Sequence, residues 1–190
     1  MSARRSVTRQ RVVTTTAEML ARHGLNATSV RELAKHAEAP LGSTYHHFPG
    51  GKQQLVSEAV AFAADQVTTG LDHHFQAGAV AGLKGFLAMW RDTLMRSDFR
   101  IGCPVLAVAI EEPIDGSGEG ALNVAAQAFR QWEDRLAAAL VMHGRDPVSA
   151  VALATLIIAA VEGGIALCRA SRSIEPFDRI ATRLVESLRT

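Results

Sequence analysis

One stretch near the N-terminus, residues 28–52, reads as two short helices joined by a tight turn. Ser29 and Glu32 have the spacing of a capping box, in which the serine hydroxyl accepts the amide N–H three residues later. Pro40 stands where a first helical residue tolerates a missing N–H. The first helix carries one apolar stripe at positions i, i+3, i+4 and i+7, formed by Val30, Leu33, Ala34 and Ala37.

The second helix of this stretch, residues 40–47, is too short to carry a core of its own. The segment Pro49–Gly51 ends it, and Lys52 opens the next helix. We expect its side chains, nearly all able to hydrogen bond, to be exposed: Ser43, Thr44, Tyr45, His46 and His47. Two short helices with a tight turn, the second one polar, are typical of a helix-turn-helix, whose second helix enters the major groove of DNA.

At these residues the chain resembles the tetracycline-repressor (TetR) family of bacterial transcription regulators. The resemblance covers about the first sixty residues and rests on residues 28–34 (TSVRELA), on residues 42–48 (GSTYHHF) and on the lysine just past a short turn. Residues 39–40, 48–52 and 102–105 look more like one branch of that family, the lincomycin-resistance repressors.

Outside this stretch the pattern is also helical, without an alternating run typical of a strand. We expect an all-α chain of nine helices. The motif occupies the second and third, and the others are expected near residues 7–23, 52–75, 79–97, 104–110, 121–143, 146–170 and 176–188. The TetR resemblance implies a three-helix DNA-binding head over residues 1–52 and a ligand-binding and dimerisation body over residues 53–190. The helix that starts at Lys52 would connect them.

The net charge of +1 hides an uneven distribution. Residues 1–52 hold eight Lys or Arg and three acidic residues, a net charge of +5, and the remainder carries −4. A basic head on an acidic body predicts a polyanionic partner for the head alone. The basic segment Ser2–Ser6 fits a solvated terminus and a phosphate or minor-groove contact equally well. The segment 112–120, rich in glycine, predicts a flexible loop.

Residues 150–168 approach the length of a membrane span but contain Glu162 and a Gly163–Gly164 pair. A helix buried on all sides has the same composition, so we expect no membrane partner. No apolar segment of a secretion signal follows the Arg-rich N-terminus, and Cys103 and Cys168 lack metal-ligand spacing. We therefore expect a cytoplasmic, nucleoid-associated bacterial protein that needs no cofactor and no metal.

The resemblance assigns roles within the motif. Arg31, Leu41, Gly42 and Ser43 match positions that face the bases, and Tyr45, His47 and Lys52 match phosphate contacts. Ser29 or Thr28 would present the first helix's amide end to a phosphate. With Thr44 and His46, these residues form the candidate DNA-binding set.

Three residues depart from the family pattern in this motif. Leu41 replaces a residue that is often polar or basic, and Pro40 replaces the usual serine cap. Glu38 occupies the turn position usually held by glycine, where φ is often positive. A carboxylate at that position also lies near DNA. We expect these departures to change the affinity for DNA without abolishing it.

The body should hold a pocket for a small apolar or aromatic inducer. Large side chains of the kind that line such sites are Phe86, Met89, Trp90, Phe99, Leu106, Phe129 and Trp132. Ordinary core packing would use the same residues. Glu111, Glu162, His143 and Arg169 are possible polar anchors, with no spacing that distinguishes them.

The last two helices are the expected homodimer surface, because a helix that is apolar nearly all round needs two neighbours. The residues expected there are Leu156, Ile157, Val161, Gly164, Ile180, Leu184 and Leu188. An ordinary core helix would have a similar sequence.

Taken together, these features predict a homodimeric, ligand-responsive transcriptional repressor that binds a pseudo-palindromic operator in double-stranded DNA. An alternative is a ligand-independent, nucleoid-type DNA-binding dimer. An enzyme is disfavoured, because the sequence has no Gly-rich phosphate loop, no nucleophile elbow and no His-x-x-x-His zinc pair.

Overall fold

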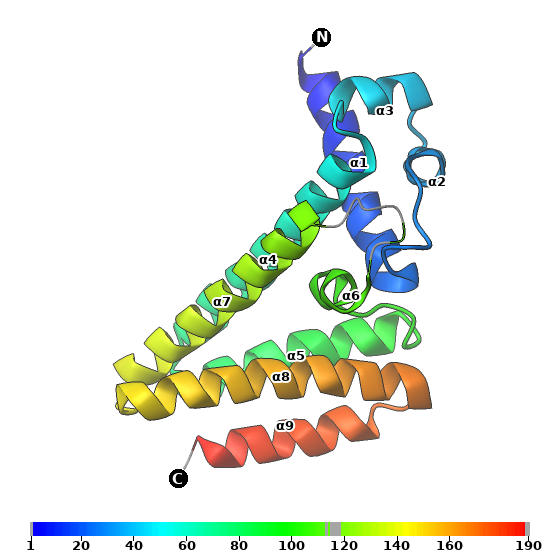
Figure 1. The fold of residues 1–190 in the computed structure, drawn as a ribbon. Coiled ribbons are helices and arrows are strands. Elements are labelled where there is room, and N and C mark those ends of the chain that lie inside the picture. Colours follow the sequence, from blue (N-terminus) through cyan, green and yellow to red (C-terminus); the bar gives the residue numbers. More distant parts are fainter. Residues whose placement is uncertain (1, 113, 115–118, 189–190) are drawn as a thin grey trace. The chain divides into compact units, whose positions relative to one another are not determined.

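The computed structural model describes residues 2–112, 114 and 119–188 (Figure 1). Within these residues the chain forms nine α-helices and no β-strand. The prediction of an all-α, nine-helix architecture is therefore confirmed. Contacts group the chain into two compact units, one made of residues 1–65 and 104–128, the other of residues 66–103 and 129–190. The expected domain boundary after residue 52 stays a prediction.

The first unit contains the motif and the helices that hold it. It comprises α1 (Ser2–His23), α2 (Val30–His36), α3 (Leu41–His47), the first part of α4 (Gly51–Phe75), α6 (Pro104–Ile110) and the first part of α7 (Glu119–Met142). Within it, α1 packs against α2, α3 and α6. The apolar stripes of these helices meet in one core, whose fully buried side chains include Val12, Leu20, Leu25, Leu33, Phe48 and Leu55.

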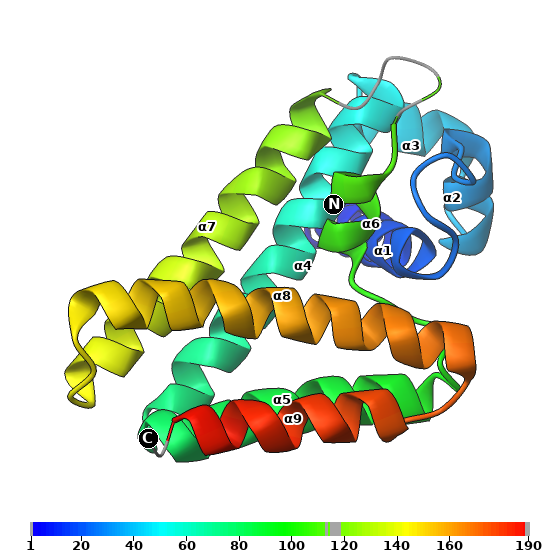
Figure 2. The same cartoon turned by 60° about the horizontal axis from the view of Figure 1, so that its bottom comes forward.

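The second unit is built around three long helices, α5 (Ala79–Arg96), α8 (Pro147–Ser171) and α9 (Glu175–Ser187), with the remaining parts of α4 and α7. Helices α8 and α9 lie side by side, and α5 packs against both of them (Figure 2). The core of this unit is large and apolar, with Leu83, Phe86, Leu94, Trp132, Ile157 and Phe177 among its buried side chains.

The helix ends follow local sequence signals. Asp146 caps α8, since its carboxylate accepts the N–H groups of Val148 and Ser149, and Pro147 occupies the first turn. Gly24 stands just past α1 with φ of +81°, as expected for a glycine that ends a helix. The expected helices are found within a few residues, except that α1 begins at Ser2 and not at Val7. Most of the predicted loop at 112–120 lies outside the described residues.

Candidate nucleic-acid interface

Helix α2 begins as the capping pattern predicts. The Ser29 hydroxyl accepts the N–H of Glu32 at 3.2 Å, and Ser29 itself has an extended backbone. Thr28 is buried, and its hydroxyl donates to the carbonyl of Leu25 at 2.7 Å. Ser29 is exposed. The amide end of α2 is therefore presented by Ser29, whereas Thr28 fastens the preceding turn.

The turn between α2 and α3 is a Schellman motif with glutamate at the left-handed position. The N–H of Ala39 bonds to the carbonyl of Ala34 at 2.9 Å, and that of Glu38 to Lys35 at 3.1 Å. Glu38 has φ of +49°, so the prediction of a positive φ at this position is confirmed. The guanidinium of Arg11 donates to the Glu38 carbonyl at 2.9 Å and holds the strained residue against α1.

Helix α3 presents some of its polar side chains outward and one inward. Tyr45, which is 51% exposed, and His46 point to solvent, and Ser43 and His47 are half-buried. Thr44 is only 1% exposed, and its hydroxyl donates to the Pro40 carbonyl at 3.2 Å. The expectation that Thr44 lies on the exposed face is therefore wrong.

The remaining candidates of the DNA-binding set are placed as follows. Arg31 on α2 is exposed and makes no hydrogen bond or ion pair with any residue that the structure describes. Leu41 and Gly42 are exposed at the start of α3, and Lys52 is half-buried at the start of α4. Pro40 is the N-cap of α3 and supplies no side-chain bond. Arg31, Tyr45 and their exposed neighbours thus lie on the two motif helices.

The end of α3 is fixed by a polar chain that joins α1 to α4. Arg9 lies over the ring of buried Phe48, 5.2 Å from its centroid, and forms an ion pair with Glu58 at 2.5 Å. The side chain of Gln54 donates to Glu58 at 3.0 Å and accepts the N–H of Gly50 at 2.9 Å. These contacts hold the turn after α3 in place, so the orientation of α3 depends on α1 and α4 together.

A second set of hydrogen bonds, here called the Glu111 bracket, joins the α1–α2 turn to the end of α6. The carboxylate of Glu111 accepts the backbone N–H groups of Leu25 at 3.0 Å and Asn26 at 2.9 Å. The Asn26 side chain donates to the Glu112 carbonyl at 3.0 Å and accepts the N–H of Ile114 at 3.1 Å. Glu111 therefore belongs to the unit that carries the motif and is not an anchor of a ligand pocket. These partners lie far apart in the sequence, so no local pattern could have revealed the bracket.

The large side chains expected to line an inducer pocket divide between the two units. Leu106 lies in the first unit, and the other six lie in the second. Phe86, Trp90 and Trp132 are buried, Met89 and Phe99 are half-buried, and Phe129 meets Trp132 edge to face at 5.4 Å. Their role in a pocket stays a prediction.

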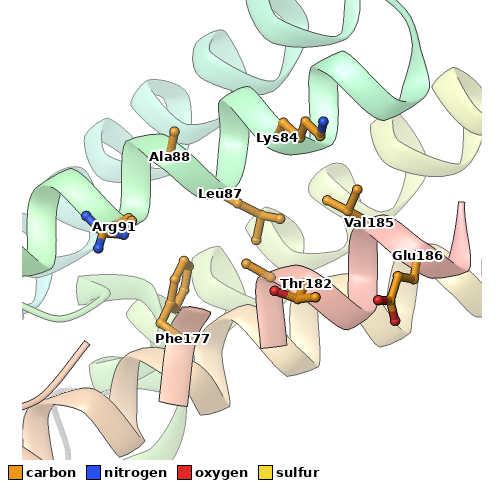
Figure 3. Close-up of a pocket in the computed structure, with 9 residues that line it drawn as sticks. Lys84, Leu87, Ala88, Arg91, Phe177, Thr182, Val185 and Glu186 are labelled. Carbon is orange, nitrogen blue, oxygen red and sulfur yellow. The ribbon is translucent and has the colours of Figure 1, made fainter. Parts of the chain in front are cut away.

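One groove of the second unit runs between α5 and α9 and measures about 440 Å³ (Figure 3). None of the seven predicted pocket residues lines it. Its floor is apolar, and Arg91 on its rim is held by Asp178 at 2.9 Å. The lining residues are Lys84, Leu87, Ala88, Arg91, Phe177, Ala181, Thr182, Val185 and Glu186.

Helix α8 has two apolar faces, and three of the four expected dimer residues on this helix lie on the inner face. Ile157, Val161, Gly164 and Leu184 are buried within their own unit, where Gly164 packs closely against Phe177 and Ile180 of α9. These four residues hold the subunit together, so their assignment to a dimer surface is corrected. Ile180 and Leu188 are half-buried, and Leu156 is exposed. The large apolar residues exposed on α8 are Val148, Val151, Leu156 and Leu167.

By length and composition alone, α8 could also cross a membrane. The core helices of soluble proteins pass the same test, so this is weak support for a span. Nearly half of its most apolar segment is buried inside the unit, as in such a core helix. The described residues contain no group of three or more His, Cys, Asp or Glu placed to hold a metal ion.

Comparison with known proteins gives the family. The family model for bacterial regulatory proteins of the tetR family matches residues 12–59, and that for the C-terminal domain of LmrA/YxaF-like transcriptional regulators matches residues 79–183. The HTH-type transcriptional regulator Rv0196 of Mycobacterium tuberculosis is 34% identical over 93% of this chain and 91% of its own length. LmrA of Bacillus subtilis is 25% identical over 95% and 96%.

Solved structures share the fold. A regulatory protein TetR from Rhodobacter sphaeroides superposes with a TM-score of 0.84 at 21% identity, covering 95% of this chain and 98% of its own. A TetR-family regulator from Agrobacterium tumefaciens gives 0.83 at 20% identity, covering 96% and 98%. The chain belongs to the TetR family of transcriptional regulators and carries a helix-turn-helix DNA-binding domain. Within that family its C-terminal part is of the LmrA/YxaF-like kind, and these relatives are regulators, not enzymes.

Proposed function

We propose that this protein is a homodimeric repressor that binds a pseudo-palindromic operator through α2 and α3 and releases it when a small apolar inducer binds the second unit. The observation that carries the proposal is the exposed surface of the motif. Arg31 and Tyr45 are free to reach DNA, and residues 1–52 carry a net charge of +5. Arginine is the commonest reader of guanine, and tyrosine hydroxyls commonly contact phosphates.

The outer face of α8 supports a second copy of the chain as the partner. Val148, Val151, Leu156 and Leu167 on this face are each more than half exposed. A stripe of this kind along a helix of 25 residues marks a surface that another protein covers. Gly163 lies on the same face with open space where a side chain would stand, which permits close approach of two helices. A two-fold dimer would match the two halves of a palindromic site.

We infer that a ligand signal reaches the motif through two elements of the chain. Helix α4 spans both units, and α6 starts directly after Cys103, the last residue of this segment of the second unit. At its other end, α6 leads into Glu111, which holds the α1–α2 turn. A movement of α6 would shift the turn before α2, and a movement of α4 would shift the turn after α3. A coupling of roughly 1–3 kcal/mol would give a ~5–150-fold change in operator affinity.

The test is a mobility-shift titration with DNA that flanks this protein's own gene, at two salt concentrations. The proposal predicts a discrete complex that survives unlabelled competitor DNA and protects two half-sites in a footprint. Diffuse binding that disappears as salt rises would instead favour a ligand-independent, nucleoid-type protein. Both outcomes agree with a cytoplasmic protein, which is the location we propose.

A further inference from the structure

Two buried polar atoms of the second unit have no hydrogen-bond partner among the described residues. They are Oε2 of Glu162 on α8 and Nε1 of Trp90 on α5, and each of the two residues is only 6% exposed. Nine in ten or more buried polar groups in proteins are paired, because leaving one unpaired is costly. A carboxylate oxygen that lacks a donor and an indole N–H that lacks an acceptor are therefore unusual, and here both occur on helices that pack against each other.

The buried Glu162 carboxyl group has a thiol as a hydrogen-bond partner. Cys103 hydrogen bonds to the Glu162 carboxyl group, and burial raises the pKa of Glu162 to about 7. The neighbouring turns of α8 place the buried side chains of Ile158 and Ile165 on the same side of the helix. On α5, Phe86 and Leu94 are buried one turn before and one turn after Trp90. The two unpaired atoms thus lie in an apolar interior.

We propose that Glu162 and Trp90 are the polar anchors of the inducer, and that the inducer is a small, mainly aromatic molecule that carries a hydroxyl group. A hydroxyl can donate to the carboxylate and also accept from an indole N–H. The apolar interior would bind the ring, and the two unpaired atoms would orient it. At pH 8, where Glu162 is ionised, it would repel an anionic group. This inference rests on the proposed ligand response and adds the chemical class of the ligand.

A matched set of three probes tests the inference: 2-naphthol, 2-methylnaphthalene and 2-naphthoate. The first two differ by a hydroxyl in place of a methyl group, and the third adds a negative charge. Binding of each probe to the full-length protein is measured by equilibrium dialysis at pH 8, above the pKa of Glu162. A site with unpaired buried polar groups discriminates against an analogue that cannot bond to them. We expect 2-naphthol to bind roughly tenfold more tightly than 2-methylnaphthalene, and 2-naphthoate to bind most weakly.

Three variants identify the residues responsible. Glu162→Leu and Trp90→Phe should each reduce the preference for 2-naphthol over 2-methylnaphthalene to about twofold or less. Phe75→Leu is the control, because Phe75 is a buried aromatic residue of the same unit that is not among the predicted pocket residues, and it should keep the preference. Glu162→Gln, which retains hydrogen-bonding capacity, should keep most of it. Thermal unfolding of each variant confirms that the protein is folded.

The outcomes separate this inference from the proposed function. Equal binding of the first two probes, tightest binding of 2-naphthoate, or no binding of any probe would overturn the assignment of Glu162 and Trp90. The assignment would also be overturned if Phe75→Leu loses the preference as fully as Trp90→Phe does. If 2-naphthol binds as expected but operator complexes persist at saturating 2-naphthol, the anchors stand and the proposed ligand response fails.

Discussion

The carboxylate of Glu111 at the end of α6 accepts the backbone N–H of Asn26 at 2.9 Å, across 85 positions of the sequence. The same carboxylate accepts the N–H of Leu25, so one side chain satisfies two amides of the turn that precedes α2. Gly24 is required beside it, because a Cβ at that position would collide with the Glu111 side chain. Since α6 starts next to Cys103, which bonds to Glu162, the bracket connects the motif along the chain to the buried carboxyl group.

Removing the bracket should weaken both the fold of the motif and its affinity for DNA. We expect Glu111→Ala to lower the free energy of unfolding by roughly 1–3 kcal/mol, because two amides lose a charged acceptor. Glu112→Ala is the control, since Asn26 bonds only to the backbone carbonyl of Glu112. Thermal or urea unfolding measures the change, and an equal effect of the two substitutions would contradict the role of Glu111.

Replacing Glu38 by glycine should raise both the stability of the protein and its affinity for DNA. Glu38 is held at φ of +49°, where a side chain costs about 1–2 kcal/mol. Part of this gain is offset by the greater freedom of glycine in the unfolded chain, so we expect Glu38→Gly to stabilise the protein by about 1 kcal/mol. The substitution also removes a carboxylate from the turn between the two motif helices, so under the proposed function operator affinity should rise.

Glu38→Gln separates these two effects, because it removes the charge and leaves the backbone strain. It should raise the affinity for DNA without raising the melting temperature. Calorimetry and a mobility-shift titration provide the two measurements. A Glu38→Gly variant less stable than the wild type would contradict the account of the turn.

Glu162 should make stability depend on pH in a defined direction. Burial raises its pKa from an ordinary value near 4.5 to about 7, so the folded state holds a proton that the unfolded state loses between these values. The stability of the wild type should therefore fall as pH rises from 5 to 8, by about 2–3 kcal/mol more than that of Glu162→Gln. Urea unfolding at the two pH values tests this. Parallel pH profiles of the two proteins would show that Glu162 is ionised in the folded state at pH 5.

A charge on the outer face of α8 should prevent dimer formation. We expect Leu156→Glu to give monomers in analytical ultracentrifugation while the helical content and the fold of the subunit persist, because Leu156 is exposed in the subunit. Met142→Glu is the control, since Met142 is an exposed apolar residue on α7. A Leu156→Glu variant that sediments as a dimer would contradict an interface on this face of α8.

The sequence predicted the helices well, because local signals determine them. The Ser29 cap, the glycine after α1 and the Asp146–Pro147 start of α8 each act within a few residues. It did not predict that Thr44 is buried, because a helix of seven residues has too few positions to define an inner face. It also could not choose between the two faces of α8, since both are apolar and periodicity does not distinguish them.

Contacts between segments far apart in the sequence could not be predicted from local sequence patterns. Glu111 could be named only as one of several acidic residues, and its partners Leu25 and Asn26 lie far away in the sequence. The same holds for the chain of contacts from Arg9 through Glu58 to Gly50. These contacts position the motif, and no local pattern of the sequence indicates them.

The measurement that tests the central claim most directly is the operator affinity of Arg31→Ala beside that of Arg183→Ala. Arg31 is exposed on α2, and Arg183 is exposed on α9 in the second unit. Fluorescence anisotropy with the footprinted operator should show a loss of roughly 1–3 kcal/mol for Arg31→Ala and none for Arg183→Ala, with both proteins still dimeric. Equal affinities of Arg31→Ala and the wild type would contradict the assignment of α2 and α3 as the DNA-binding surface.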